Sequence, residues 1–265
     1  MRVFVEGIGL LGPGLNGWQA SCPALSGAAP YVPAPTNVPL SDMLPAAERR
    51  RTGVAVRLAL AAGGEAFRNA GRDAAATATV FTSSDGDGDN THQIYESLAS
   101  PQRELSPTRF HNSVHNAAAG YWSIAARSRE PSTSLCCYDA SFAAGLLETA
   151  VQVAVGGRPA ALIAYDQPYP EPLHSVRPLA ASFGVAFVLT PALTSRTRAS
   201  LDVEFAAVPP ETTRMTDAGL EAVRADVPAA RSLPLLAALA RRESADLVLE
   251  YAAVTCLRIA VTPCV

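Results

Sequence analysis

The chain has 265 residues, of which 49% are apolar and 17% charged, with a net charge of −3 and an isoelectric point near 5.8. This length allows one large domain or two small ones with a substantial buried core. The mild acidity argues against a nucleic-acid-binding protein, which usually carries a basic face. No uninterrupted apolar run approaches ~20 residues, so membrane insertion is not expected.

The N-terminus and the cysteines favour a reducing compartment. The first residues, from Met1 to Gly7, are typical of a first strand and lack a positively charged segment followed by an apolar one, so a signal peptide is not expected. The five cysteines are an odd number without metal-type spacing. Cys136 and Cys137 are expected on opposite faces of a strand, a poor geometry for pairing with each other. We therefore expect a cytoplasmic protein without a metal or a cofactor.

Strand and helix patterns alternate along the chain. Strands are expected at residues 2–9, 77–83, 133–138, 160–165, 183–190, 201–207, 247–252 and 256–261. Helices are expected at residues 44–70, 90–99, 113–126, 141–155 and 233–242. The segments 16–45 and 209–228 are expected to be irregular. This alternation predicts an α/β layered fold, built as a single domain over residues 1–265.

The first glycine-rich segment formally matches a dinucleotide-binding motif. Gly7-Ile-Gly9-Leu-Leu-Gly12 has the spacing G-x-G-x-x-G after a first strand. A dinucleotide site also requires a helix that opens immediately and an acidic residue about 20 positions on. Pro13 follows instead, and the region around residue 30 has no carboxylate. A structural turn is the favoured interpretation.

The second glycine-rich segment resembles a calcium loop. Asp85, Asp87, Asp89 and Glu96 have the required spacing, but Asn90 replaces the glycine at the sixth position, and a strand precedes the loop. Glycine and aspartate are also ordinary turn residues after a strand. The favoured interpretation is an exposed strand-to-helix turn in which Asp89 or Asn90 caps the helix.

His111 and His115 have the spacing of one helical turn. A zinc protease needs glutamate beside the first histidine, and Asn112 occupies that place; no third ligand is evident from spacing. The histidines are better explained as polar residues at an interface or a cavity. Tyr121 and Trp122, on the same helix, suit either a partner surface or the core.

Ser141, Asp166 and His174 occur in the order of a Ser–Asp–His hydrolase. No G-x-S-x-G surrounds Ser141, and a chain of this length offers such triples by chance. The hydrolase interpretation therefore rests on residue order alone.

Residues 131–148 predict a short strand that turns sharply into a helix of small residues. Such an elbow exposes one side chain at the helix N-terminus, where backbone N–H groups and the dipole favour an anion or a thiolate. Asp139 occupies the exposed position. A carboxylate is a poor acyl acceptor compared with a cysteine thiolate. We expect Asp139 to cap the helix that starts at Ser141.

Together these segments resemble the N-terminal half of a β-ketoacyl synthase, one of the thiolase-like condensing enzymes. The resemblance is strongest to the short ketosynthase-like chain length factors of aryl-polyene and similar pigment pathways. It covers residues 1–207 most clearly and is carried by residues 5–14, 49–53, 80–87, 106–124, 139–148 and 180–191. It implies an α-β-α layered fold comprising a single thiolase half, with a five-stranded mixed sheet and a C-terminal β extension.

The resemblance also implies a loss of catalysis. In the family, an elbow cysteine accepts the acyl chain, and two histidines from the second half assist condensation. Asp139 stands at the cysteine position, and a shift of one residue puts the equally inert Ala140 there. The second half with its histidines is not expected within these residues. The implied protein is a non-catalytic subunit that pairs with a full-length β-ketoacyl-ACP synthase and meets acyl carrier protein indirectly.

In such a heterodimer, the strand before the elbow would pair with its counterpart in the partner. Bulky residues of the helix at 112–124 would close the partner's acyl tunnel and set product length. The tunnel and interface candidates are Phe110, His111, His115, Tyr121, Trp122, Cys137, Tyr138 and Asp139. Two alternatives stay open: a thiolase-fold hydrolase or decarboxylase that uses Asp139 or Ser141, and a homodimeric acyl-binding scaffold.

Overall fold

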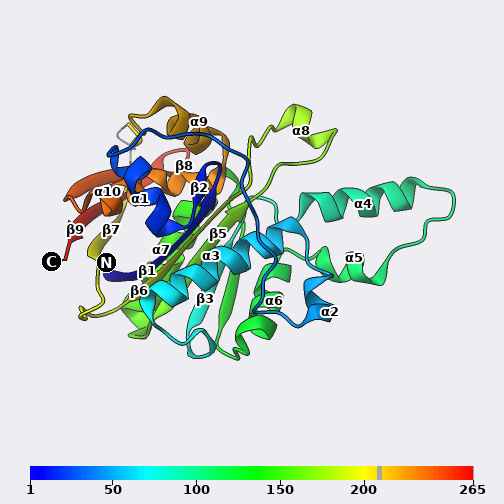
Figure 1. Ribbon diagram of the computed structural model, residues 1–265, viewed down its shortest axis with the longest axis horizontal. Helices are drawn as coiled ribbons and strands as arrows, with labels where there is room; N and C mark the ends of the chain where they lie inside the picture. Colours follow the sequence, from blue (N-terminus) through cyan, green and yellow to red (C-terminus); the bar gives the residue numbers. More distant parts are fainter. Residues whose placement is uncertain (208–210, 265) are drawn as a thin grey trace.

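A computed structural model describes residues 1–207 and 211–264, in which nine strands form one sheet covered by helices on both faces (Figure 1). The strands are β1 (Arg2–Gly12), β2 (Leu15–Asn16), β3 (Ala78–Thr82), β4 (Ser132–Leu135), β5 (Ala160–Asp166), β6 (Phe183–Thr190), β7 (Ala199–Ala207), β8 (Ala245–Ala252) and β9 (Thr255–Pro263). The α-helices are α1 (Trp18–Ser26), α2 (Ala46–Arg49), α3 (Val54–Ala70), α4 (Gly88–Ala99), α5 (Pro107–Asn112), α6 (Ala117–Ala126), α7 (Ser141–Gly156), α8 (Leu173–Val176), α9 (Ala218–Asp226) and α10 (Leu233–Arg241). The short 3-10 helices are η1 (Ala74–Ala76), η2 (Tyr138–Ala140) and η3 (Pro228–Ser232).

The strand order is β4-β3-β5-β6-β1-β7-β9-β8, and β2 pairs with the end of β1. In the first half of the sheet, β4, β3 and β5 run parallel, whereas β6 pairs antiparallel with both β5 and β1. β7, β9 and β8 continue the sheet with antiparallel pairing. The expected five-stranded mixed sheet with a C-terminal β extension is therefore confirmed. The extension prolongs the same sheet and leaves β4 at one edge.

Two hydrophobic clusters lie on opposite faces of the sheet. On one face, α3 and α6 pack against β3, β5 and β6, and the Trp122 ring lies 5.3 Å from the Phe67 ring. On the other face, α7 covers the centre of the sheet, with Phe142 and Phe187 at a centroid distance of 6.1 Å. Helix α10 packs on β8 and β9 of the extension, and α1 packs against α10 and β1. These layers establish the expected α-β-α arrangement.

Gly7 and Gly9 lie inside β1, so the expected turn at this motif is wrong. A Cβ atom on Gly7 would lie 2.1 Å from the carbonyl oxygen of Ala66, and one on Gly9 would lie 1.9 Å from that of Ala62. Both carbonyls belong to α3. The motif therefore serves close packing of a helix backbone on a strand, a known use of glycine within sheets.

Three expected elements differ from the structure because local patterns compete with tertiary packing. α1 lies in the segment 16–45, which was expected to be irregular, and packs against α10 despite Pro23 inside it. α9 lies in the segment 209–228, of which residues 209 and 210 fall outside the described residues; Asp217 caps it by accepting from two backbone N–H groups. The expected helix at 113–126 is instead α5 and α6, separated by a turn at residues 113–116.

The helix expected at residues 44–70 is also divided. α2 ends at Arg49, a break follows, and α3 starts only at Val54. Gly53 lies immediately before α3 with extended backbone angles, which is the conformation of a helix N-cap.

Helices α4 and α5 project from the body of the molecule as an arm (Figure 1). Helix α4 begins at Gly88, and the Asp87 side chain caps it by accepting from the backbone N–H of Asn90 at 3.0 Å. The expected cap at Asp89 or Asn90 is thus wrong by two or three positions. The arm and the turn after it expose large apolar side chains, namely Tyr95, Leu98, Leu105, Phe110 and Val114.

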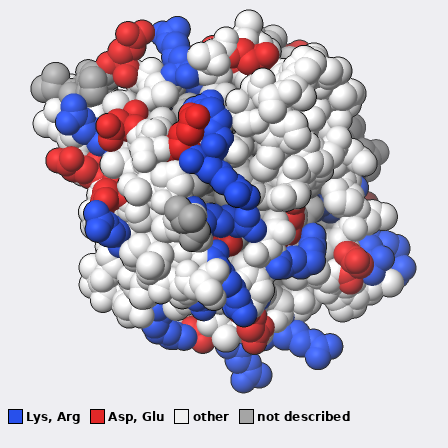
Figure 2. Space-filling model, turned by 60° about the vertical axis from the view of Figure 1, so that its left-hand side comes forward, with Lys and Arg blue, Asp and Glu red and all other residues white. Residues whose placement is uncertain are grey.

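Charged side chains cross the face that carries both termini. Figure 2 shows arginine side chains in a band across this face, with acidic side chains interspersed among them. At the N-terminal end of β1, Arg2 pairs with Asp202 at 2.7 Å. The alternation of buried and more exposed residues along β8 and β9 fits a sheet extension that buries one face and leaves the other in solvent.

Candidate functional site at the strand-to-helix turn

The turn between β4 and α7 is held by its own backbone and by Ser141. The strand ends at Leu135, earlier than the expected Tyr138, so Cys136 and Cys137 lie beyond it. The Ser141 hydroxyl donates to the carbonyl oxygen of Tyr138 at 2.7 Å and accepts from the Cys137 N–H at 3.1 Å. Tyr138 has a φ of 51°, in the left-handed region that few non-glycine residues adopt. The elbow is therefore present, with its strained residue one position before Asp139.

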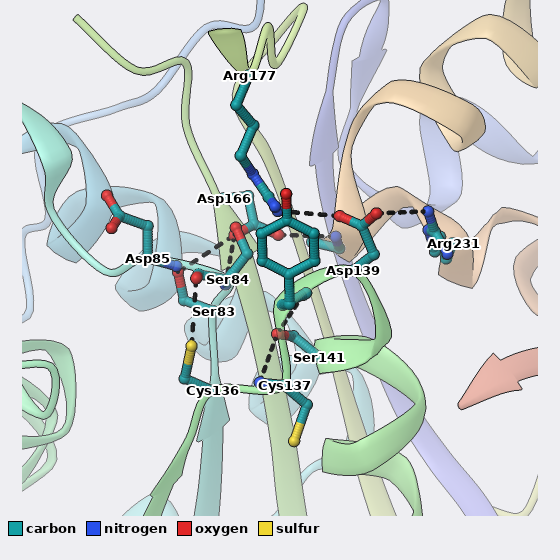
Figure 3. A network of polar contacts seen from close by, with 12 residues as sticks. Ser83, Ser84, Asp85, Cys136, Cys137, Asp139, Ser141, Asp166, Arg177 and Arg231 are labelled. Carbon is teal, nitrogen blue, oxygen red and sulfur yellow. Dashed lines mark hydrogen bonds and ion pairs between the residues drawn. The ribbon is translucent and has the colours of Figure 1, made fainter. Parts of the chain in front are cut away.

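Asp139 does not cap α7. Position 140 is the N-cap of this helix, and it provides no side-chain hydrogen bond. Asp139 lies instead between two guanidinium groups, accepting from Arg177 Nη2 at 2.9 Å and lying 3.3 Å from Arg231 Nη2 (Figure 3). The expected capping role is wrong, because two arginines from distant segments offer the carboxylate stronger, charge-assisted partners than the helix N-terminus does.

The two arginines join separate parts of the chain at the elbow. Arg177 follows α8, in the connection from β5 to β6, and its side chain is 15% exposed. Arg231 lies in η3 of the C-terminal extension and also pairs with Glu250 of β8. A series of ion pairs thus runs from Arg177 through Asp139 and Arg231 to Glu250. These ion pairs connect the C-terminal extension to the elbow.

Asp166, at the end of β5, is the most buried charged group near the elbow. Its carboxylate accepts four hydrogen bonds: from the Ser84 N–H and hydroxyl, each at 2.8 Å, from the Ser83 hydroxyl at 3.2 Å, and from the Ala229 N–H at 2.8 Å. Burial raises the pKa of Asp166 to about 6, against the opposing effect of these donors. Asp166 therefore joins the loop after β3 to the start of η3.

The thiols at the elbow are not activated. Cys136 donates its S–H to the carbonyl oxygen of Ser84 at 3.2 Å, and burial raises the pKa of both Cys136 and Cys137. A raised pKa keeps a thiol protonated, whereas a nucleophilic cysteine needs a lowered one. All four histidines are described, and none of them hydrogen-bonds a side chain at residues 136–141. The elbow offers neither a thiolate nor a paired base.

A hollow of about 520 Å³ opens beside the elbow, between it and the β8–β9 hairpin. Its lining combines residues 137–140 with Thr212, Arg231, Glu250–Ala253 and Thr255. The C-terminal extension thus forms one wall of the space beside the turn. The arrangement can present a rigid surface, but it does not align a nucleophile with a base.

A family model for the β-ketoacyl synthase N-terminal domain matches residues 22–252 of the chain. The chain belongs to this family. No curated protein matches the sequence. The expected thiolase-like α/β fold is confirmed by solved structures that share it.

Three of these structures contain a chain of nearly the same extent. One is a ketosynthase (ApeO) in complex with its chain length factor (ApeC) from Xenorhabdus doucetiae, with 23% identity, a TM-score of 0.74 and coverage of 98% of this chain and 99% of that one. The ishigamide ketosynthase/chain length factor has 13% identity, a TM-score of 0.75 and 99% coverage of each chain. A type II PKS acyl-carrier protein in complex with its ketosynthase (AntDE:AntF) has 10% identity, a TM-score of 0.74 and 99% coverage of each chain. At these identities the similarity shows the fold.

Within this β-ketoacyl synthase domain, Tyr121 and Trp122 are core residues. They are 2% and 1% exposed, and the Tyr121 hydroxyl donates to the side chain of Asn112 at 3.0 Å. Of the two interpretations offered for these aromatics, the core one is correct. They do not contribute to a partner surface, because α6 turns them toward α3 and the sheet.

The two histidines are separated by the turn between α5 and α6. His111 lies in the last turn of α5 with its ring edge-on to Tyr121, whereas His115 lies in the turn after α5, with Nε2 3.1 Å from the carbonyl oxygen of Ser83. The expected spacing of one helical turn is therefore wrong. Phe110 and Tyr138 are exposed, at 67% and 62%, and remain candidates for the surface.

The hydrolase triad does not assemble. The Ser141 hydroxyl is buried and satisfied by backbone groups of the turn, while Asp166 contacts Ser83, Ser84 and Ala229 rather than His174. Among the described residues, no group of three or more His, Cys, Asp or Glu side chains is placed to hold a metal ion. None of the described helices has both the length and the apolar character needed to cross a bilayer.

Arg177 and Arg231 are residues of the site that sequence reasoning did not identify. Arg177 lies 38 positions after Asp139 in a proline-rich connection, and Arg231 lies in a segment without a motif. A carboxylate at the elbow indicates that a basic side chain lies close to it. The sequence does not indicate which of the arginines this is.

Proposed function

We propose that this chain is a non-catalytic, chain-length-factor-like subunit that pairs with an active β-ketoacyl-ACP synthase in the cytoplasm and shapes its acyl tunnel. The observation that carries this proposal is the Asp139 carboxylate, held between Arg177 and Arg231 at the elbow where the family places its nucleophile. A condensing enzyme needs a nucleophile with a base within hydrogen-bond reach. At this elbow, the Asp139 carboxylate and the Ser141 hydroxyl are engaged in structural contacts, and burial raises the pKa of the Cys136 and Cys137 thiols.

The free edge of β4 supports pairing with another chain. The carbonyl groups of Pro131 and Leu135 accept from Thr79 and Ser83 of the neighbouring strand. Because successive residues of a strand alternate in direction, Thr133 also faces β3, whereas Ser132 and Ser134 direct their backbone groups outward. Among the described residues β4 pairs only with β3, and an exposed edge strand is a template for pairing.

Apolar side chains flank this edge on both sides of the sheet. Ile124 of α6 is 45% exposed, and Val151 and Val155 of α7 are 36% and 82% exposed. Both helices contact β4. An unpaired edge between two helices that expose apolar side chains fits a partner that adds a strand and covers the helices.

The similar solved structures support the same partner. Two of them are complexes of a ketosynthase with a chain length factor, and a third contains an acyl carrier protein with its ketosynthase. We infer that this chain contacts a ketosynthase directly and acyl carrier protein through that partner. Phe110, exposed on α5, is the bulky side chain we propose for the tunnel wall, with His111 beside it. A wall of this kind sets length because an overlong chain must displace packed side chains.

Two proline variants test the pairing. Ser134→Pro removes an N–H that points to solvent. We therefore expect a folded chain that no longer co-purifies with its partner, a ketosynthase encoded by a neighbouring gene. Thr133→Pro removes an N–H that faces β3, and we expect it to destabilise the chain itself. Co-expression with the ketosynthase, size-exclusion chromatography and a condensation assay on malonyl-acyl-carrier protein provide the readout.

The same experiment separates the alternatives. A wild-type chain that forms a stable homodimer and ignores the ketosynthase would support the homodimeric scaffold and contradict the heterodimer. Acyl hydrolysis or decarboxylation by the chain alone, lost in Asp139→Ala or Ser141→Ala, would support the enzyme instead.

A further inference from the structure

Tyr138 combines a strained backbone with an exposed side chain. Its φ of 51° is unfavourable for a residue with a Cβ, and such strain persists only where neighbouring groups enforce it. The side chain is 62% exposed, so burial of the ring in the chain's own core does not compensate for the strain. Glycine or asparagine would adopt this conformation at lower cost.

The surrounding polar groups fix this tyrosine in place. The Arg177 guanidinium lies 3.3 Å from the centroid of the Tyr138 ring. The same guanidinium lies 5.8 Å from the centroid of the Tyr169 ring. Tyr169 is 7% exposed, and its hydroxyl is 3.2 Å from that of Ser84. Through Arg177, the exposed ring is therefore connected to the core.

Asp139 and Ser141 also help to hold Tyr138 in position. Asp139 holds Arg177 at 2.9 Å, and the Ser141 hydroxyl holds the carbonyl oxygen of Tyr138 at 2.7 Å (Figure 3). The groups that occupy the former reactive elbow thus orient one aromatic side chain toward solvent.

An immobilised, exposed tyrosine is typical of an interface anchor. Tyrosine buries a large area at a small cost in side-chain entropy, and residues of this kind dominate the energy of protein interfaces. Tyr138 lies three positions beyond the end of β4, the edge at which the proposed partner strand adds. One face of the ring is occupied by Arg177, and the exposed remainder is available to a second chain.

We infer that Tyr138 is an anchor residue that this chain inserts into the surface of its partner ketosynthase. The elbow, which carries the nucleophile in the family, here holds the Tyr138 side chain in position for this contact. This inference rests on the proposed heterodimer. The partner surface it fits is an apolar recess beside the counterpart of β4, because a tyrosine ring is largely apolar and Tyr138 is 62% exposed.

The test measures affinity for the ketosynthase and the stability of the chain alone. Tyr138→Gly removes the ring and relieves the strained φ, while Tyr138→Ala removes the ring and keeps the strain. We expect both to weaken binding by about 10- to 100-fold, the range in which interface anchors fall. We expect Tyr138→Phe, which keeps the ring, to bind within about threefold of the wild type. Leu193→Ala is the matched control, since Leu193 is a large apolar residue, 63% exposed, in the connection after β6.

Thermal unfolding of the free variants distinguishes an anchor from a structural residue. If Tyr138 served only to shield the Arg177–Asp139 pair, Tyr138→Gly would lower the melting temperature and leave affinity intact, which would overturn the inference. Affinities of Tyr138→Gly and Tyr138→Ala equal to that of the wild type would also overturn it, while leaving the heterodimer standing. A wild-type chain that binds no ketosynthase would overturn both proposals.

Discussion

Arg177 and Asp139 lie 38 positions apart in the sequence, yet the Arg177 guanidinium donates to the Asp139 carboxylate at 2.9 Å and covers the preceding residue, Tyr138. This contact gives the elbow carboxylate a structural role. In a β-ketoacyl synthase domain, the same turn is the place for a nucleophile, and here its carboxylate is committed to a guanidinium.

Restoring a thiol at position 139 should not restore catalysis. Asp139→Cys places a thiol at the elbow beside Arg177 and Arg231, but no described histidine is positioned to accept its proton. We expect no condensation by the free variant with malonyl-acyl-carrier protein, measured as carbon dioxide release and product formation. Asp139→Asn is the companion variant; because Asp139 is 46% exposed, loss of its ion pairs should cost only about 0.5 kcal/mol of stability. Condensation by Asp139→Cys alone would show that a base is present after all.

Asp166 should make stability depend on pH. Its pKa is raised by burial to about 6 in the folded chain, above the ~3.9 of an unfolded aspartate. Between these two values the folded state holds a proton that the unfolded state has lost. The unfolding free energy should therefore fall as pH rises from about 4 to about 6, by up to about 3 kcal/mol from this group.

Urea unfolding at a series of pH values measures this effect. Asp166→Asn removes the titrating group, so the difference between wild type and variant should change across the interval. At low pH the variant should be about 1–3 kcal/mol less stable than the wild type, because an amide nitrogen cannot accept a hydrogen bond as a carboxyl oxygen can, and this deficit should shrink as pH rises. Asp246→Asn, at an exposed position on β8, provides the control. A wild-type–variant difference independent of pH would contradict the prediction.

Gly9 should not tolerate alanine. The added Cβ would lie 1.9 Å from the carbonyl oxygen of Ala62, and α3 must move away from β1 to admit it. We expect a loss of about 3 kcal/mol or more in the unfolding free energy, at the upper end for overpacked sites. Gly120→Ala is the matched control: it lies exposed in α6 with no atom within 4 Å of the added Cβ, and should gain about 0.5–1 kcal/mol.

Trp122 should affect stability rather than product length. Its ring packs against Phe67 and Phe81 in the core, so Trp122→Ala should cost about 3–5 kcal/mol by chemical denaturation. The products of any heterodimer that still assembles should keep their length. A stable variant with longer products would instead place Trp122 at the tunnel.

Phe110 should show the opposite pattern. Its side chain is 67% exposed, so Phe110→Ala should change the stability of the free chain by less than about 0.5 kcal/mol. In the assembled enzyme, we expect longer products from Phe110→Ala and shorter ones from Phe110→Trp, read by mass spectrometry of the acyl chains. Unchanged lengths in both variants would remove Phe110 from the tunnel wall.

Sequence patterns were sufficient for the layered α/β fold, because the period of apolar residues and the glycine and proline positions are local properties. They also identified the elbow, since a strand followed directly by a helix of small residues is visible within residues 131–148. The predicted bounds of helices differ from the structure where a local pattern is interrupted. The turn between α5 and α6 and the helix α1 with its internal Pro23 depend on packing partners far away in the chain.

The sequence by itself determined that the residue at the elbow is a carboxylate, and therefore a poor acyl acceptor. Only the tertiary structure decided what that carboxylate does. Arg177 and Arg231 come from separate connections, and the fold brings both to the turn that follows β4. The strength of an ion pair depends on the distance between the two charges in space and not on their separation along the chain. The same folding buries Trp122 and exposes Tyr138, a difference that no local pattern around either residue could supply.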